Sequence, residues 1–139
     1  MSTTLPSISE VEEAFAFFED WEDRYRYIMD LGEKLPAMPR ADCVDANLVR
    51  GCQSTVWVTM QVDGDSVLVN AQSDSQLVKG LAAIVVIAVT GLTPREIVNL
   101  DLEAIFGRLR LHDHLSPTRS NGLHGMVQQV RSRAAALAA

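Results

Sequence analysis

The sequence predicts an α/β protein of the α+β type, with a small antiparallel sheet packed against several helices in a single domain, residues 1–139. Two observations carry this prediction. Apolar residues alternate with polar ones across residues 54–62, and the following Asp63-Gly64 pair is typical of a tight hairpin turn. Elsewhere the apolar residues recur mainly at helical spacing. Because a lone hairpin is only marginally stable in water, helices or a further strand must cover one face of it.

Length and composition fit one folded domain and argue against two classes of function. A chain of 139 residues with 47% hydrophobic and 22% charged residues can bury an ordinary core. Its formal net charge of −6 argues against nonspecific nucleic-acid binding, which depends on clustered lysine and arginine. The longest apolar stretch, residues 81–89, is far shorter than the roughly 20 residues of a membrane-spanning helix. We expect neither nucleic acid nor a membrane as a partner.

The first third of the chain predicts two helices and a loop. Ser7 and Glu10 have the spacing of a capping box and precede apolar residues at helical spacing. Asp20 is placed to cap a second helix, and we expect Gly32 to end it. Residues 35–47 contain two prolines, which oppose helix, so an irregular loop is expected there.

The hairpin is expected to form from residues 54–62 and a returning strand that ends near Asn70 and Ala71. Val56, Val58, Met60 and Val62 would lie on one face of the first strand, and the residues between them on the other. The segment 47–50 could add a short extra strand beside it.

The second half of the chain predicts several helices that begin after capping residues. A helix from about Gln76 to Val89 is apolar nearly all round, so we expect it to be the central buried helix. Gly80 costs this helix about 1 kcal/mol relative to alanine, which suggests close approach of another backbone. Gly91 is expected to end it. The later helices are expected to begin after Thr93, Asp101 and Ser116.

Cys52 is the candidate reactive residue of the chain. A free cysteine is usually a small buried hydrophobe, but Cys52 stands between Gly51 and Gln53, just ahead of a strand. Reactive residues tend to lie on loops held by rigid elements, and Gly51 could act as a hinge. The chain has only two cysteines, and the other, Cys43, lies in the proline-containing loop.

Other thiol and metal chemistries have weaker support. A cysteine hydrolase needs a histidine base beside the thiol, and the three histidines all lie late in the chain, so spatial pairing stays open. His112 and His114 could form a metal pair, but zinc sites usually need three or four protein ligands. An iron–sulfur scaffold usually presents several thiolates. We expect no metal site.

Residues 50–57, Arg-Gly-Cys-Gln-Ser-Thr-Val-Trp, resemble the signature of the SufE family, the sulfur-acceptor proteins of iron–sulfur cluster assembly. Further segments resemble the same family in the same order, so the resemblance covers nearly the whole chain. These segments are residues 21–32, 35–36, 73–75 with 78–81, 92–94 and 114–123.

This resemblance implies a SufE/IscU-like fold and a persulfide carrier that is not itself an enzyme. Cys52 would accept sulfur from a pyridoxal-phosphate cysteine desulfurase of SufS type, or a paralogue, and stimulate its turnover. The sulfur would then pass to an iron–sulfur scaffold complex of SufBCD type. The cofactor would belong to the desulfurase, so the chain would carry none. The second-tier candidates for setting the loop or contacting the partner are Gly51, Gln53, Asp74 and Arg119.

Two rival functions remain open from the sequence. A regulatory module could activate a desulfurase by docking, without carrying sulfur. A cysteine-dependent hydrolase would use Cys52 as its nucleophile instead. Two cysteines with no secretion signal at the N-terminus favour free thiols in a reducing cytoplasm.

Overall fold

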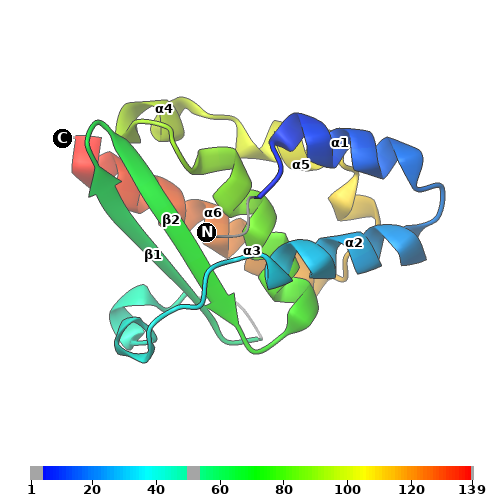
Figure 1. The fold of residues 1–139 in the computed structure, drawn as a ribbon, viewed down its shortest axis with the longest axis horizontal. Helices are drawn as coiled ribbons and strands as arrows, with labels where there is room; N and C mark the ends of the chain where they lie inside the picture. Colours follow the sequence, from blue (N-terminus) through cyan, green and yellow to red (C-terminus); the bar gives the residue numbers. More distant parts are fainter. Residues whose placement is uncertain (1–4, 50–53, 139) are drawn as a thin grey trace.

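The computed structural model describes residues 5–49 and 54–138, which form helices around one β-hairpin (Figure 1). The α-helices and strands, in chain order, are α1 (Ile8–Phe17), α2 (Trp21–Glu33), β1 (Val56–Asp63), β2 (Ser66–Ser73), α3 (Gln76–Val89), α4 (Pro94–Asn99), α5 (Leu102–Arg108) and α6 (Pro117–Ala138). Short 3-10 turns occupy Arg40–Asp42, Asp45–Asn47 and Leu111–Asp113. The predicted α+β class is confirmed.

The hairpin forms where the alternating pattern predicted it, but the returning strand runs to Ser73 and does not end near Asn70 and Ala71. β1 and β2 pair antiparallel from Val56 with Ser73 to Asp63 with Ser66, so Gly64 and Asp65 make the turn. Gly64 has a φ of +65°, which suits glycine far better than other residues. The valines of one face are buried at Val56 and Val58, whereas the turn end of β1 is exposed.

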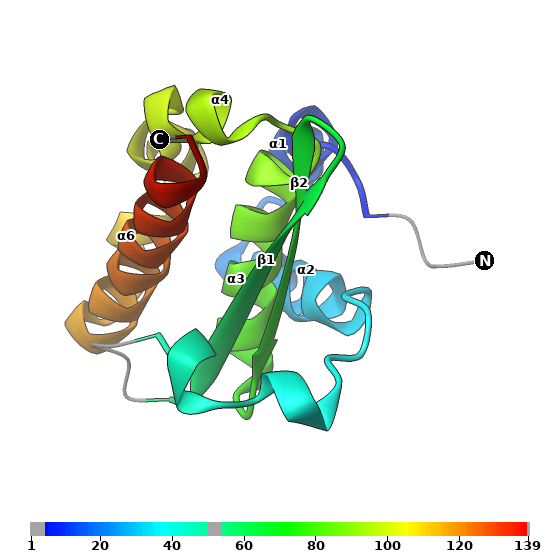
Figure 2. The ribbon, with the colours of Figure 1, turned by 90° about the vertical axis from the view of Figure 1, so that its left-hand side faces the viewer.

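Helix α3 is the centre of the fold, as its composition predicted. Every residue from Gly80 to Val86 is buried. The helix contacts α2, strand β2 and α6, and Figure 2 shows it between α6 and α2 behind the hairpin. Its first turn is capped by Ser75, whose hydroxyl accepts the N–H of Val78 at 3.3 Å. The chain then leaves through Gly91, which has a φ of +90°.

Two glycines allow α2 and α3 to pack with their backbones in close contact. A Cβ added to Gly80 would overlap the carbonyl oxygen of Ile28, and one added to Gly32 would lie 2.8 Å from the nitrogen of Gly80. The expected close approach at Gly80 is therefore confirmed. The expectation that Gly32 ends its helix is wrong, because α2 continues to Glu33 and Gly32 is buried in this contact.

The proposed extra strand is reduced to a single bridge. Leu48 pairs with Trp57 in an isolated antiparallel bridge, and the N–H of Val49 donates to the carbonyl of Val56 at 2.8 Å. The preceding residues, Asp45–Asn47, form a 3-10 turn and not extended backbone. Among the described residues the sheet consequently has two strands.

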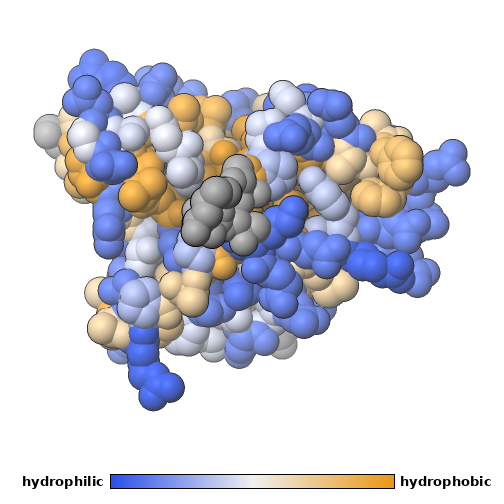
Figure 3. All heavy atoms as spheres, in the orientation of Figure 1, coloured by the Kyte–Doolittle hydropathy of each residue, from blue (hydrophilic) through white to orange (hydrophobic). Residues whose placement is uncertain are grey.

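The surface is mixed rather than apolar. On the face seen in Figure 3, hydrophobic residues form separate patches and hydrophilic residues cover most of the remaining area. The most exposed large hydrophobic side chains are Phe17, at the end of α1, and Val62 and Leu68 on the hairpin. Within residues 5–49 and 54–138, no helix combines the length and apolar character needed to cross a membrane.

Candidate functional site

The principal candidate, Cys52, lies outside the described residues, as do Gly51 and Gln53. The structure describes the two ends of the connection that contains them, at Val49 and Ser54. It also describes Asp74 and Arg119, the other two predicted site residues. What the structure describes of the candidate site is its frame, meaning the residues on either side of the cysteine segment together with Asp74.

The frame holds the two ends of this connection next to each other. Val49 donates to Val56, and Leu48 bridges to Trp57, so the outgoing chain is tied to β1. On the returning side, the Oδ1 of Asp74 accepts the N–H of Thr55 at 3.2 Å. The N–H of Asp74 lies 3.4 Å from the carbonyl oxygen of Thr55 and completes a two-way contact. Asp74 thus fixes the start of β1 against the turn that leads into α3.

A small pocket opens directly beside the returning end. Its volume is about 90 Å³, enough for a few water molecules or part of one side chain. Ser54 is at its edge, and the walls come from the first turns of α3 and α6. The lining residues are Ser54, Val78, Leu81, Thr118, Arg119, Gly122, Leu123 and Met126.

The pocket combines an apolar floor with one cation. Val78, Leu81, Leu123 and Met126 are all buried, whereas Arg119 is exposed on the first turns of α6. Within the described part of the chain, the Arg119 guanidinium has no hydrogen-bond or ion-pair partner. The central helix α3, which the sequence predicts to be buried, supplies one apolar wall. The wall from α6 was missed, although the apolar spacing of Leu123 and Met126 already indicated a buried stripe there.

Aromatic contacts fix the chain that enters α6. The ring of His114 stacks on Trp21, with 3.9 Å between the ring centroids and 20° between the planes. The hydroxyl of Tyr25 donates to the backbone carbonyl of His114. Two segments that resemble SufE, residues 21–32 and 114–123, therefore meet here. The contact holds the approach to Thr118 and Arg119, the residues at the rim of the pocket.

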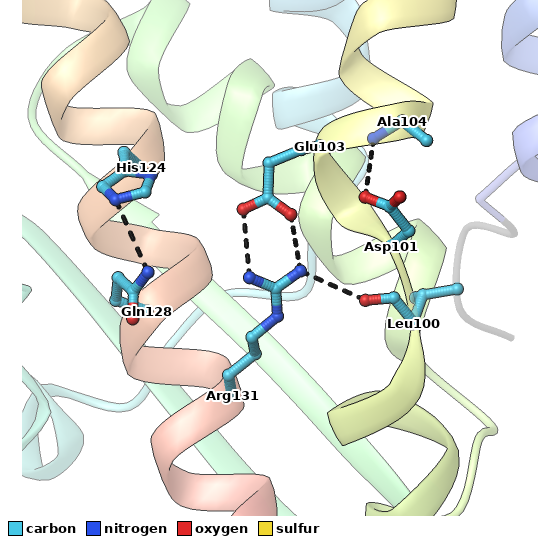
Figure 4. A network of polar contacts seen from close by, with 7 residues as sticks. All are labelled: Leu100, Asp101, Glu103, Ala104, His124, Gln128 and Arg131. Atoms are coloured by element: carbon cyan, nitrogen blue, oxygen red, sulfur yellow. Dashed lines mark hydrogen bonds and ion pairs between the residues drawn. The ribbon is translucent and has the colours of Figure 1, made fainter.

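A bidentate ion pair lies away from the pocket, between α5 and α6 (Figure 4). The guanidinium of Arg131 binds both carboxylate oxygens of Glu103, at 2.6 and 3.0 Å, and also the carbonyl of Leu100 at 3.1 Å. The hydrogen bond from Arg131 lowers the pKa of Glu103 below its ordinary value. Neither residue lines the pocket, so the pair fastens one helix to another.

The described residues give no support to a hydrolytic or metal site. None of the residues that line the pocket is a histidine. The His114 ring is stacked on Trp21, and the His124 ring contacts the side chain of Gln128 at 3.4 Å. Across residues 5–49 and 54–138, no three histidine, cysteine or acidic side chains are grouped to hold a metal ion. Cys43 is a free, half-buried thiol in the loop before the site.

Comparisons with known proteins agree with the sequence motifs. The family model SufE, described as an Fe-S metabolism associated domain, matches residues 9–134. An uncharacterized SufE-like protein of Rhizobium meliloti (strain 1021) is 39% identical over 134 residues, which cover 94% of this chain and 96% of the relative.

The fold also has a solved counterpart. The solution structure of a hypothetical protein from Thermus thermophilus matches over 100% of both chains, with a TM-score of 0.77 and 20% sequence identity. At that identity the likeness concerns the fold alone. The family model and the relative together cover nearly the whole sequence, so the chain belongs to the SufE family, whose domain is associated with Fe–S metabolism.

Proposed function

We propose that this protein carries sulfur as a persulfide on Cys52 during iron–sulfur cluster assembly. The donor is a cysteine desulfurase of SufS type or a paralogue, and the receiver is a scaffold complex of SufBCD type. Membership of the SufE family supports the general role in Fe–S metabolism. The assignment to Cys52 is supported by the pocket beside Ser54. Cys52 is two positions before Ser54, so the chain keeps their Cα atoms within about 7 Å.

The transfer itself is an exchange between sulfur atoms. The Cys52 thiolate attacks the terminal sulfur of the donor's persulfide, a new sulfur–sulfur bond forms, and the donor's cysteine leaves as a thiolate. No oxidant or reductant is consumed, because one S–S bond replaces another. The chain needs no cofactor for this step, since the pyridoxal phosphate that mobilises sulfur belongs to the desulfurase.

The frame and the pocket suit the three demands of a carrier. The thiol must be ionised to attack, and a positive charge such as that of Arg119, which lines the pocket, favours a thiolate brought close to it. The bound sulfur must be kept from water and reductants, and the apolar walls from α3 and α6 supply such surroundings. The sulfur must then be presented to a partner, which a segment tied at both ends to rigid elements can do reproducibly. A reducing cytoplasm is the compartment we propose for this chemistry.

The decisive experiment is mass spectrometry of the protein after incubation with desulfurase and cysteine. We expect the peptide that contains Cys52 to gain the mass of one sulfur atom, and this gain to disappear on treatment with a reductant. The Cys43→Ser variant is the matched control and should gain the same mass. The carrier assignment fails if the gain is absent from the Cys52 peptide or appears on Cys43 instead.

The Cys52→Ser variant separates a carrier from a module that only docks. For a carrier, we expect the variant to bind the desulfurase but no longer to stimulate its release of sulfur from cysteine. Full stimulation by Cys52→Ser would establish the docking module. A labelled acyl group on Cys52 after incubation with activated esters would instead support a hydrolase.

A further inference from the structure

Arg133, near the C-terminal end of α6, joins this helix to both stems of the cysteine connection. The stems are the chain just before the connection, at Ala46 and Asn47, and the chain just after it, at Val58. One terminal nitrogen of its guanidinium donates to the carbonyl of Val58 in β1 at 3.0 Å. The other donates to the carbonyl of Ala46 at 2.6 Å and to the Oδ1 of Asn47 at 2.9 Å. Ala46 and Asn47 precede the connection, and Val58 follows it. A single half-buried side chain therefore bridges the outgoing and the returning chain.

The guanidinium of Arg133 replaces a backbone hydrogen bond to Val58 that a longer third strand would have made. The carbonyl of Val56 accepts from Val49, and in an antiparallel ladder the carbonyl two residues on, at Val58, faces the same edge. A longer third strand would satisfy it with a backbone N–H. Here the 3-10 turn uses the N–H of Asn47 to bind Val44 at 2.9 Å. Arg133 supplies the donor that the backbone no longer offers.

A second residue of α6 strengthens the same contact. The side-chain amide of Gln129, one turn before Arg133, donates to the carbonyl of Asn47 at 3.3 Å. Asn47 in turn donates from its own amide to the carbonyl of Asp42 at 2.8 Å. Asn47 is therefore held through both its backbone and its side chain.

The same face of α6 also forms one wall of the pocket. Met126 lines the pocket, Val130 is buried in the core, and Arg133 follows at the next helical spacing. Because a helix is rigid over two turns, a contact made at Arg133 fixes the stems relative to the pocket wall at Met126. No comparable link would exist if the stems were held only to each other.

We propose that Arg133 is a positioning residue for Cys52, which it never needs to touch. By fastening both stems to α6, it sets where the cysteine connection leaves and re-enters the fold relative to the pocket. The proposal rests on the proposed function in that it treats Cys52 as the working thiol. It adds a residue about 80 positions away in the sequence to the machinery that places this thiol.

The test compares Arg133→Met with Arg131→Met in a Cys43→Ser background, where Cys52 is the single thiol. Methionine keeps the aliphatic stem of each arginine and removes its donors. Arg131 is a close control, because it lies on the same helix and also makes three hydrogen bonds, but to Glu103 and Leu100. The readouts are the urea midpoint and the rate at which iodoacetamide alkylates Cys52 in the folded protein.

We expect both methionine variants to lower the urea midpoint. Only Arg133→Met should change the alkylation rate of Cys52, by about threefold or more, which is the size of effect expected from the loss of one hydrogen bond. Arg133→Lys should restore part of the parent rate. Asn47→Ala, which removes one partner of Arg133 without altering α6, should shift the rate in the same direction and serves if Arg133→Met does not fold. Equal rates for the parent and the Arg133 variant, or equal changes in both methionine variants, would overturn the proposal.

This outcome is separable from that of the proposed function. Alkylation by iodoacetamide requires no desulfurase and no sulfur transfer. If Cys52 gains no sulfur in the mass measurement, the carrier function fails while the alkylation result still decides the role of Arg133. If Cys52 gains sulfur but Arg133→Met matches Arg131→Met in both readouts, the positioning role alone fails.

Discussion

The absence of a side chain at position 80 sets the distance between α2 and α3. An added Cβ would meet the backbone of Ile28, which cannot move aside without shifting α2. We predict that Gly80→Ala destabilises the protein by at least about 2 kcal/mol, within the usual range for overpacked cores. Alanine's better helix propensity, about 1 kcal/mol, offsets only part of this cost. Urea unfolding followed by circular dichroism measures the difference.

Gly107 provides the matched control for this substitution. It also lies within a helix, α5, but a Cβ there would meet no atom within 4 Å. Gly107→Ala should therefore be neutral or stabilise the protein by up to about 1 kcal/mol. If both alanine variants unfold at the same urea concentration as the parent, the close approach of the two helices does not constrain position 80.

Among the elements, helix α6 is tied to its neighbours by two arginines with different roles. Arg131 fastens it to α5 through Glu103, and Arg133 fastens it to β1 and the turn at Asp45–Asn47. The first contact can be tested by its response to pH, because it lowers the pKa of Glu103 below the ordinary value of 4.5.

A lowered pKa in the folded state means that ionised Glu103 stabilises the fold. Its contribution is complete above the unfolded pKa and is lost as the pH falls through the lower, folded value. The side chains of Glu103 and Arg131 are 43% and 27% exposed, respectively. We therefore expect Glu103→Gln to lower the free energy of unfolding by only about 0.5–1 kcal/mol at pH 7. The difference between variant and parent should shrink steadily below the ordinary pKa of 4.5.

Thermal unfolding of both proteins over a range of pH values checks this prediction. Glu22→Gln is the control, because the side chain of Glu22 is 85% exposed and its carboxylate lies 3.7 Å from the guanidinium of Arg26. It should leave stability within about 0.5 kcal/mol of the parent at every pH. A cost for Glu103→Gln that persists undiminished in acid would show that packing, and not the charge, accounts for it.

The elements that the sequence predicted well are those specified by neighbouring residues. The capping boxes at Ser7 with Glu10 and at Thr93 with Glu96 both form, as does the cap at Asp101. The elements predicted wrongly depend on distant parts of the chain. Gly32 has the composition of a helix end, but the packing of α3 against it decides its role.

The site shows the same division between local and distant information. Local sequence singled out the cysteine segment, and the resemblance to SufE singled out Asp74, which holds the returning chain at Thr55. Arg133 escaped notice because an arginine near the end of an alanine-rich helix resembles any solvated residue. Its three acceptors come from segments 75 or more positions away, which no local pattern reveals.

At the scale of the whole molecule, one buried cluster contains residues of both strands and of every α-helix. It extends from Val11 in α1 through Val56 and Ile84 to Ala134 in α6. The pocket beside Ser54 is therefore built on α3 and α6, elements that share this core. A domain of this size with a single core is expected to unfold in one cooperative step.

The two tryptophans allow that expectation to be tested, because they report on different parts of the fold. Trp21 begins α2 and stacks on His114, whereas Trp57 lies in β1 and bridges to Leu48. We predict that Trp21→Phe and Trp57→Phe, each with one remaining tryptophan, show tryptophan-fluorescence midpoints in urea that coincide with their own circular-dichroism midpoints. If the hairpin region opened separately, the signal of Trp57 would change at lower urea than the circular dichroism of the same variant. Coincidence means that the frame around Cys52 is as stable as the core on which it is built, so any exposure of the thiol must arise within the connection and not from unfolding of the hairpin.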